Sequence, residues 1–289
     1  MKKRILIPAL LLLVLLCGCV GTANTQTAAS GIVCTTQQLA DLTERVLDGT
    51  AAGDGTEVSC VVTEPVSCLH DYTLSVRQMQ LLENAAVVIE SGMGLEDFME
   101  DALRASHCTR ITASAGVAAL PSDEDPDEPD PHLWLAPENC ARMAQTIADG
   151  LAELYPEDAA RLRENAADYA REMDELQAYG EQALSSLSCR KLVTFHDGFS
   201  YFADAFGLEI AAAMEVEAGS EPSAKELEEI VQVVREDAIP AVFSETNGTQ
   251  DAAQLVARET GADVFVLDMG LSNPDAIRNN IDTVKEALQ

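Results

Sequence analysis

Basic residues are scarce in this sequence. It holds 18 Lys and Arg against 49 Asp and Glu, which gives a formal net charge of −31 at pH 7. A chain this acidic is repelled by nucleic acid and by anionic membrane surfaces, so neither is expected as a partner. The charge is compatible with attracting cations, although solubility accounts for most of it without any ligand.

Aromatic residues and common metal-binding motifs are scarce too. Aromatic side chains make up 4% of the chain, with a single tryptophan, and no segment is repeated, so nothing favours the binding surface of an adhesin or a structural lipoprotein. There is no Cys-x-x-Cys pair and no His-Glu-x-x-His, which argues against a cysteine-only zinc site and against a zinc hydrolase. The other candidate metal ligands are carboxylates and the four histidines, His70, His107, His132 and His196.

No apolar run is long enough to cross a bilayer comfortably. The longest, Ile5 to Leu16, follows the basic residues Lys2, Lys3 and Arg4 and has the form of an export signal. It ends in Leu-Leu-Cys-Gly-Cys, which resembles the lipobox of bacterial lipoproteins. By that resemblance residues 1–19 are a signal peptide, and Cys19 is lipidated and anchors the chain. An ordinary secretory signal cut nearby is the alternative, and both place the protein outside the cytoplasm. Residues 20–30 are typical of a flexible tether.

Six cysteines follow this leader, an even number in an exported chain. They are Cys34, Cys60, Cys68, Cys108, Cys140 and Cys189. Disulfides or buried thiols are both expected for such a set, and six cysteines allow fifteen pairings, so the pairing stays open.

From residue 31 the sequence alternates short β-branched runs with longer helical patterns. This order is typical of βαβ units and predicts an α/β fold with parallel sheets. Strands are expected over residues 32–34, 57–63, 86–90, 109–113, 191–195, 208–214, 241–244 and 263–267, and helices over residues 37–47, 75–84, 95–106, 138–154, 157–187, 198–206, 223–237, 250–260 and 274–288. Ser223 with Glu226 should cap one helix, and Gly261 should end another.

The pattern divides the chain into two lobes. We expect an N-terminal α/β lobe over residues 31–154, a long linking helix within residues 155–188 with Pro156 in its first turn, and a C-terminal α/β lobe over residues 189–289. Such a helix would be on the order of 45 Å long, enough to run across both lobes as a stiff connector.

His132 lies in an unusual segment, Asp130-Pro-His-Leu-Trp-Leu-Ala-Pro137, after an acidic loop over residues 123–130. The loop holds too much like charge to be buried, so it is either a solvated connector or a region that gathers metal. The two prolines and the apolar residues predict a rigid, buried segment. Taken alone, His132 is more typical of a core histidine packed beside Trp134.

Four candidate ligands each come after a predicted strand. They are His70, His132, His196 and Asp268. Open parallel sheets gather ligand-binding groups at the carboxyl ends of their strands, so two facing lobes would bring these four side chains into one crevice. His107 ends a helix and is expected at the surface.

Each of the three histidines also has an aspartate close by in sequence: Asp71, Asp130 or Asp197. A carboxylate that accepts the second ring N–H is the usual outer partner of a metal-bound imidazole. Glu245, at the end of another strand, is the only obvious candidate for the catalytic base of a zinc enzyme. We expect it instead to be structural or to support the metal site.

Several segments together resemble a known family. The chain is similar, along essentially the whole length after the leader, to the TroA-like metal-binding lipoproteins of zinc and manganese ABC transporters. The segments that carry the resemblance are Cys68-Leu-His-Asp-Tyr72, Ser91 to Phe98, Asp130-Pro-His-Leu-Trp-Leu135, Phe195-His-Asp-Gly-Phe199 and Leu267-Asp268.

The resemblance implies two α/β lobes joined by one long helix, with a metal ion between them bound by His70, His132, His196 and Asp268. Three imidazoles and one carboxylate suit Zn²⁺, whereas Mn²⁺ prefers more oxygen ligands. The manganese-type relatives carry a carboxylate at the position of His196, so zinc is expected and manganese is the alternative. Two features depart from the family. The loop before His132 is acidic, whereas zinc-type relatives often carry a histidine-rich loop there. The six cysteines are more than the family needs, and Cys68, two residues from His70, could be a disulfide partner or an additional ligand.

The function expected from these observations is an extracytoplasmic, lipid-anchored, monomeric zinc-binding protein that delivers its ion to an ABC transporter permease. A manganese- or iron-binding protein of the same family is the alternative, and a zinc-dependent hydrolase or a surface adhesin is less favoured. The chain is not expected to be an enzyme.

Overall fold

The computed structural model describes residues 31–64, 69, 72–122, 128–214, 223–246, 248, 250–270, 273 and 275–289. The expected signal peptide, tether and lipidation site at Cys19 lie outside the described residues, as do Cys68, His70, Asp71 and most of the acidic loop. Within the described part, no helix is both long and apolar enough to cross a membrane.

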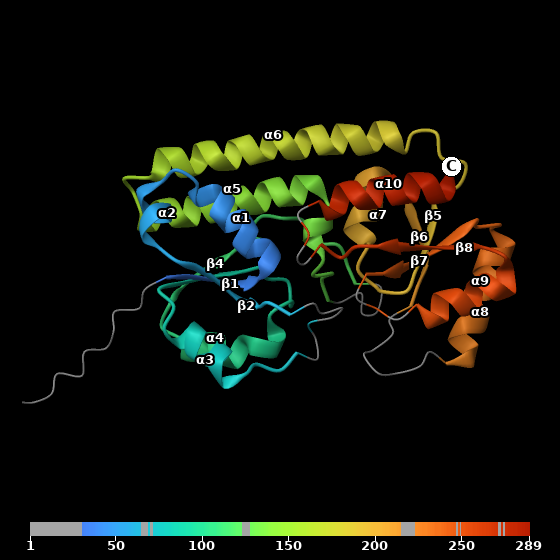
Figure 1. Cartoon of the computed structure of the whole chain (residues 1–289), viewed down its shortest axis with the longest axis horizontal. Helices are drawn as coiled ribbons and strands as arrows, with labels where there is room; N and C mark the ends of the chain where they lie inside the picture. The colour runs from blue at the N-terminus through green and yellow to red at the C-terminus, as the bar shows by residue number, and fades with distance from the viewer. Residues whose placement is uncertain are drawn as a thin grey trace, which may run out of the picture.

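Two parallel four-stranded sheets organise the chain (Figure 1). The first has the order β2-β1-β3-β4 and the second β6-β5-β7-β8, with every pairing parallel. Their strands are β1 (Ile32–Thr36), β2 (Val58–Val62), β3 (Val87–Glu90), β4 (Thr109–Thr112), β5 (Lys191–Thr194), β6 (Glu209–Ala213), β7 (Ala241–Glu245) and β8 (Asp263–Leu267). The predicted α/β fold with two parallel sheets is confirmed.

Helices cover both faces of each sheet (Figure 1). The N-terminal lobe contains α1 (Gln37–Leu47), α2 (Ala51–Gly55), α3 (Val76–Glu83), the 3₁₀ turn η1 (Asp97–Met99) and α4 (Glu100–Ala105), followed by η2 (Leu133–Leu135) and α5 (Pro137–Leu154). The C-terminal lobe contains α7 (Ser200–Phe206), α8 (Ala224–Glu236), α9 (Asp251–Thr260) and α10 (Ala276–Leu288). Because strands covered on both faces contact no water, β1 and β3 are continuous buried runs.

The long helix α6 (Ala159–Ala183) crosses from one lobe to the other, as predicted (Figure 1). Its 25 residues span about 37 Å, and it packs against α1 and α5 at one end and α7 and α10 at the other. The predicted range, residues 157–187, was too long. Pro156 lies in the turn before the helix, where the Asp158 carboxylate accepts hydrogen bonds from the Ala51 and Ala52 N–H groups of α2.

The other predicted boundaries lie within two residues of the observed ones, with one exception. The helix expected over residues 95–106 is split into η1 and α4. The two short elements α2 and η2 were not predicted. The predicted caps are confirmed: Ser223 and Glu226 form a capping box, and Gly261 ends α9 with a φ of +84°.

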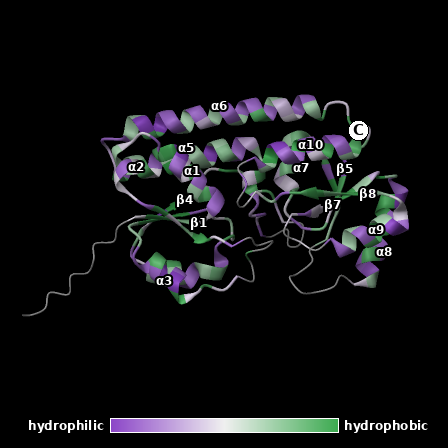
Figure 2. Ribbon diagram, viewed as in Figure 1, coloured by the Kyte–Doolittle hydropathy of each residue, from purple (hydrophilic) through white to green (hydrophobic). Residues whose placement is uncertain are grey.

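One buried apolar cluster runs through both lobes. It extends from Ile32 in β1 through Trp134 and Leu176 to Phe202 and Leu288, and a smaller cluster lies between the second sheet, α8 and α9. Figure 2 shows hydrophobic residues along the strands and mostly hydrophilic ones on the outer face of α6. Only a narrow stripe of α6, such as Leu162 and Leu176, is therefore buried.

The cysteines of the described chain are free thiols. Cys34 and Cys140 are buried, and Cys60, Cys108 and Cys189 are half-buried. Burial raises the pKa of Cys34 to about 12 and that of Cys60 to about 11. Cys34 and Cys60 are therefore protonated at neutral pH.

Candidate metal centre

Two of the candidate ligands, His132 and His196, meet between the lobes. Their Nε2 atoms lie 3.4 Å apart and their rings cross edge to face, with centroids 5.2 Å apart. The His196 side chain is 4% exposed and that of His132 is 13% exposed. Residues 64 positions apart in sequence thus place two ring nitrogens side by side.

The His132 ring is held by its own segment. Asp130 accepts both the backbone N–H of His132 and its Nδ1, each at 2.8 Å through Oδ1. This contact fixes the orientation of the ring and directs its Nε2 towards His196. The Trp134 ring packs against the imidazole edge to face at 5.5 Å, and its Nε1 donates to the Met269 carbonyl at 2.7 Å.

His196 follows β5 and lies beside the end of β7. Its Nδ1 is 3.9 Å from Oε2 of Glu245, and both side chains are buried. Gly198 is required by the same packing: a Cβ there would lie 2.8 Å from His196 Cδ2, 3.1 Å from His132 Cε1 and 2.6 Å from Met269 Cε. Any larger residue would push the two histidines apart.

Asp268 directly follows β8, and residues of the next loop orient its carboxylate. Its carboxylate accepts the Gly270 N–H at 2.8 Å and the Asn273 amide at 2.7 Å. The buried Asn280 bridges its backbone, accepting the Asp268 N–H and donating to its carbonyl. The next residue, Met269, reaches the Gly198 backbone beside the histidines.

The structure brings together only part of the predicted ligand set. Among the described residues, no three His, Cys, Asp or Glu side chains are close enough to hold a metal ion together. His132 and His196 are paired, Asp268 does not join them in such a set, and His70 lies outside the described residues. The role of Asp268 therefore stays a prediction.

The predicted carboxylate partners take different positions. Asp130 contacts His132 directly, whereas the carboxylate 3.9 Å from His196 Nδ1 belongs to Glu245. Asp197 accepts a hydrogen bond from Ser122 at 3.5 Å, which links it to the N-terminal lobe. Asp71 lies outside the described residues. His107 is exposed, as predicted.

The loop after β3 lies on the N-terminal side of the lobe junction. Glu96 is buried and accepts Thr35 Oγ1–H and the Ser91 N–H at 2.7 Å and the Gly92 N–H at 2.8 Å. Burial raises the pKa of Glu96 to about 7, although these hydrogen bonds lower it. The carboxyl group pins a loop in which Met93 has a φ of +56°.

Tyr201 on α7 ties that loop to the C-terminal lobe. The buried hydroxyl accepts the Leu120 N–H at 3.0 Å and donates to Met93 Sδ at 3.7 Å. Sequence reasoning assigned no role to Tyr201, Glu96 or Gly198. Glu96 and Gly198 lie inside the family-like segments, and Tyr201 follows one of them closely. Their contacts with other parts of the chain could not be predicted, because those contacts depend on the folded structure.

Relatives of known name resemble most or all of the chain. It is 26% identical over 308 residues to the manganese-binding lipoprotein MntA of Halalkalibacterium halodurans, an alignment that covers 100% of this chain and 99% of the relative. It is 30% identical to the iron-binding protein YfeA of Yersinia pestis over 73% of this chain and 69% of that protein. The zinc-binding lipoprotein AdcA of Streptococcus pneumoniae is 27% identical over 93% of this chain, which spans 55% of AdcA.

Solved structures and family models agree with these relatives. A crystal structure of ZnuA superposes with a TM-score of 0.79 at 29% identity, covering 90% of this chain and 99% of that one. The family model described as the periplasmic zinc-uptake complex component A matches residues 32–287. The chain belongs to this family of periplasmic metal-binding components of ABC transporters, whose members are not enzymes.

Proposed function

We propose that this protein captures a zinc ion between its lobes and delivers it to an ABC transporter permease. The observation that supports the proposal most is the pair of Nε2 atoms of His132 and His196, 3.4 Å apart and with Asp130 holding the far side of one ring. Two imidazole nitrogens this close together can bind one borderline-soft divalent cation.

The remaining ligands follow from sequence position. In the sequence, His70 comes eight residues after the end of β2, and Asp268 comes directly after β8. Together with the histidine pair they make a set of three imidazoles and one carboxylate. Four protein ligands of these types match the tetrahedral coordination that zinc prefers.

The choice of zinc depends on the nitrogen content of the set. His196 supplies an imidazole where manganese-type relatives carry a carboxylate, and manganese prefers oxygen ligands. MntA is named for manganese and YfeA for iron, so a manganese or iron cargo is the alternative. Elemental analysis of protein purified without chelator distinguishes them.

Anchoring is proposed at Cys19. Its position after a short apolar run resembles a lipobox, and both MntA and AdcA are named lipoproteins. A lipid on this cysteine would keep a monomeric binding protein at the outer face of the cell membrane, near its permease. Replacing Cys19 with serine should release the protein into the medium.

Calorimetric titration tests the metal site. Wild-type protein should bind one zinc per chain with submicromolar affinity, and His196→Ala should lose that binding. His107→Ala is the matched control, because His107 is exposed and outside the site, and it should bind like wild type. No zinc binding by wild type, or unchanged binding by His196→Ala, would refute the proposal.

A further inference from the structure

Two cysteines lie next to each other in the first sheet. Cys34 in the inner strand β1 is the register partner of Cys60 in the edge strand β2, and the two strands are parallel. Neighbouring strands lie about 4.8 Å apart, which is within the range of about 4.4 to 6.8 Å that separates the Cα atoms of disulfide-bonded cysteines. The backbone therefore holds the two residues at a separation that a disulfide can bridge.

Both side chains point to the same face of the sheet. Directly paired residues on parallel strands share a face, and α1 packs against β1 and β2. The Cys34 thiol contacts Thr43 of α1 at 3.4 Å. Burial is the main cause of the raised pKa of each thiol, Asp41 of α1 raises both further, and Cys60 itself adds to the rise in the pKa of Cys34. The two thiols therefore lie together between the sheet and α1.

Neither thiol is held by a strong contact. The Cys34 Sγ–H donates to Thr43 Oγ1 at 3.4 Å, and the Cys60 Sγ–H donates to the Val62 carbonyl at 3.1 Å. Thiols are weak hydrogen-bond donors, and a change of rotamer about each Cα–Cβ bond turns the sulfur away from its acceptor. A bond between the sulfurs thus replaces two weak hydrogen bonds and leaves the pairing of the strands intact.

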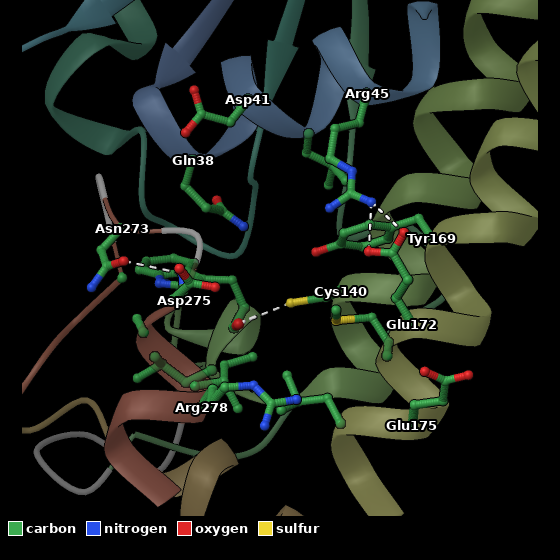
Figure 3. A pocket seen from close by; sticks show the side chains of 18 residues that line it. Gln38, Asp41, Arg45, Cys140, Tyr169, Glu172, Glu175, Asn273, Asp275 and Arg278 are labelled. Carbon is green, nitrogen blue, oxygen red and sulfur yellow. Dashed lines mark hydrogen bonds and ion pairs between the residues drawn. The ribbon is translucent and has the colours of Figure 1, made fainter. Parts of the chain in front are cut away.

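The remaining described cysteines have other neighbours. Cys140 borders the pocket shown in Figure 3, where its Sγ–H donates to a carbonyl of η2 at 2.9 Å. Cys108 precedes β4, at the opposite edge of the first sheet from β2, and Cys189 precedes β5 in the second sheet. Within the described chain, Cys34 and Cys60 are the only two cysteines that are register partners.

Cys60 is the thiol of the pair that solvent can reach. It is half-buried on the edge strand, whereas Cys34 is buried on the inner strand. The chain belongs to a family of periplasmic proteins, and disulfides form and persist in oxidising compartments of that kind. An oxidant should therefore react first at Cys60.

We propose that Cys34 and Cys60 form a disulfide that joins β1 to β2, with a low-molecular-weight disulfide as the oxidant. The Cys60 thiolate attacks one sulfur of that oxidant and expels a thiolate, which leaves Cys60 in a mixed disulfide. The Cys34 thiolate then attacks the Cys60 sulfur and expels the second thiolate. The two cysteines lose two electrons and two protons, and the oxidant is reduced to two thiols. The bond holds in place the edge strand that precedes the His70 segment.

The surroundings of the pair make this reaction slow in the folded protein. Burial raises the pKa of Cys34 to about 12 and that of Cys60 to about 11. The charged groups that raise these pKa values further are carboxylates: Asp41 and Glu44 on α1, and Glu64 after β2. Because only the thiolate reacts, the rate should increase about tenfold for each pH unit between about pH 7 and 9. Thiolate is more abundant in the unfolded chain, so the bond is expected to form mainly as the chain folds.

Peptide mapping tests the pairing. The full chain is reduced, treated with glutathione disulfide, alkylated and digested with trypsin without further reduction. Trypsin cleaves after Arg45 and Arg77 and nowhere between them, so Cys34 and Cys60 lie in two different peptides. These two peptides should be recovered joined, and reduction should separate them.

Four variants identify the cysteines that form the bond. Cys68 shares a tryptic peptide with Cys60, so the mapping is repeated in Cys68→Ser, where the joined peptides should persist. They should also persist in Cys189→Ser, the matched control, because Cys189 is half-buried like Cys60 but lies outside the first sheet. Cys60→Ser and Cys34→Ala should each lose them. Oxidised wild type should unfold about 5 °C or more above the reduced protein, because the bond restricts the unfolded chain.

Either of two findings would overturn the proposal. One is oxidised wild type that yields no joined peptides and whose Cys34 and Cys60 are both still alkylated. The other is joined peptides that disappear in Cys68→Ser, which would assign the bond to Cys68. The wild-type mapping needs no variant, so it stays decisive if a substitution impairs folding. Absence of zinc binding by wild type would refute the proposed function and leave this pairing untouched.

Discussion

Asp130 offers the sharpest test of how the site is built. Its Oδ1 accepts two hydrogen bonds from His132, both at 2.8 Å, and the side chain is 3% exposed. Removing an outer partner of a metal-bound histidine typically costs 10- to 100-fold in metal affinity, which is about 1.4 to 2.7 kcal/mol. A hydrogen bond to a charged group contributes about 1.5 to 3 kcal/mol, so the two figures agree.

We expect Asp130→Ala to weaken zinc binding at the upper end of that range, because the ring loses its orientation and its fixed tautomer. Asp130→Asn should fall at the lower end, since the amide oxygen can still accept from Nδ1 without a full charge. Glu128→Gln is the control, because it removes a nearby charge that is exposed.

Competition with a chelator of known zinc affinity measures these changes, and thermal unfolding shows whether each variant is folded. A folded Asp130→Ala whose affinity stays within about threefold of wild type would show that the contact does not support metal binding, since the expected loss is at least tenfold.

Four further predictions concern protons, metal choice and motion. Zinc affinity should fall as the pH drops through about 6.5, because imidazole binds metal only when neutral; constant affinity down to pH 5 would contradict a three-histidine site. His196→Asp should shift the selectivity measured by metal competition from zinc towards manganese, because it replaces nitrogen with oxygen. Burial raises the pKa of Glu96 from 4.5 to about 7, so the folded protein holds this proton where the unfolded chain has lost it. The free energy of unfolding should therefore fall by about 3 kcal/mol as the pH rises from 4.5 to above 7, and denaturant titrations of Glu96→Gln should lack this part of the dependence. Small-angle scattering should give nearly equal radii of gyration with and without zinc, and a large difference would contradict a stiff link between the lobes.

Much of the fold was predictable because buried parallel strands leave a plain signal. Val87–Glu90 and Asp263–Leu267 are short runs rich in β-branched residues between helical patterns, and each forms a strand of a parallel sheet, although only Val87–Glu90 is buried throughout. The split of residues 95–106 was not predictable, because the buried Glu96 carboxylate at its start is held by Thr35 of β1 as well as by two backbone N–H groups of its own loop.

The candidate site was predictable only in part. The positions of His132 and His196 after strands and inside recognisable motifs indicated that they would meet, and their Nε2 atoms do. Adjacency correctly indicated Asp130 as a partner of His132, whereas Glu245, whose Oε2 lies 3.9 Å from His196 Nδ1, comes from another strand. Neighbouring parallel strands present their ends to the same edge of a sheet, so a residue distant in sequence can reach the same histidine.

The packing of α6 limits how the ion can enter and leave. At the N-terminal lobe, Asn165 donates to the Val46 and Asp48 carbonyls at 2.9 and 2.8 Å. At the C-terminal lobe, a Cβ on Gly180 would lie 2.3 Å from Phe206 Cε1. The backbone of α6 therefore packs directly against the Phe206 ring of α7. Because close-packed interiors do not deform continuously, a wide hinge opening would have to break contacts at one of these ends.

The groups that can move at low cost are therefore the loops that meet at the histidines. The two lobes touch there through the Tyr201 hydroxyl, which bonds Leu120 and Met93, and through the Ser122 contact with Asp197. These polar contacts bury little apolar surface, and each contributes only about 0.5 to 1.5 kcal/mol. Opening them exposes the side of the site that faces the loops while α6 and the shared core stay intact. For an ion bound at His132 and His196, as proposed, this rigid frame would leave exchange to the segments around Met93 and Leu120.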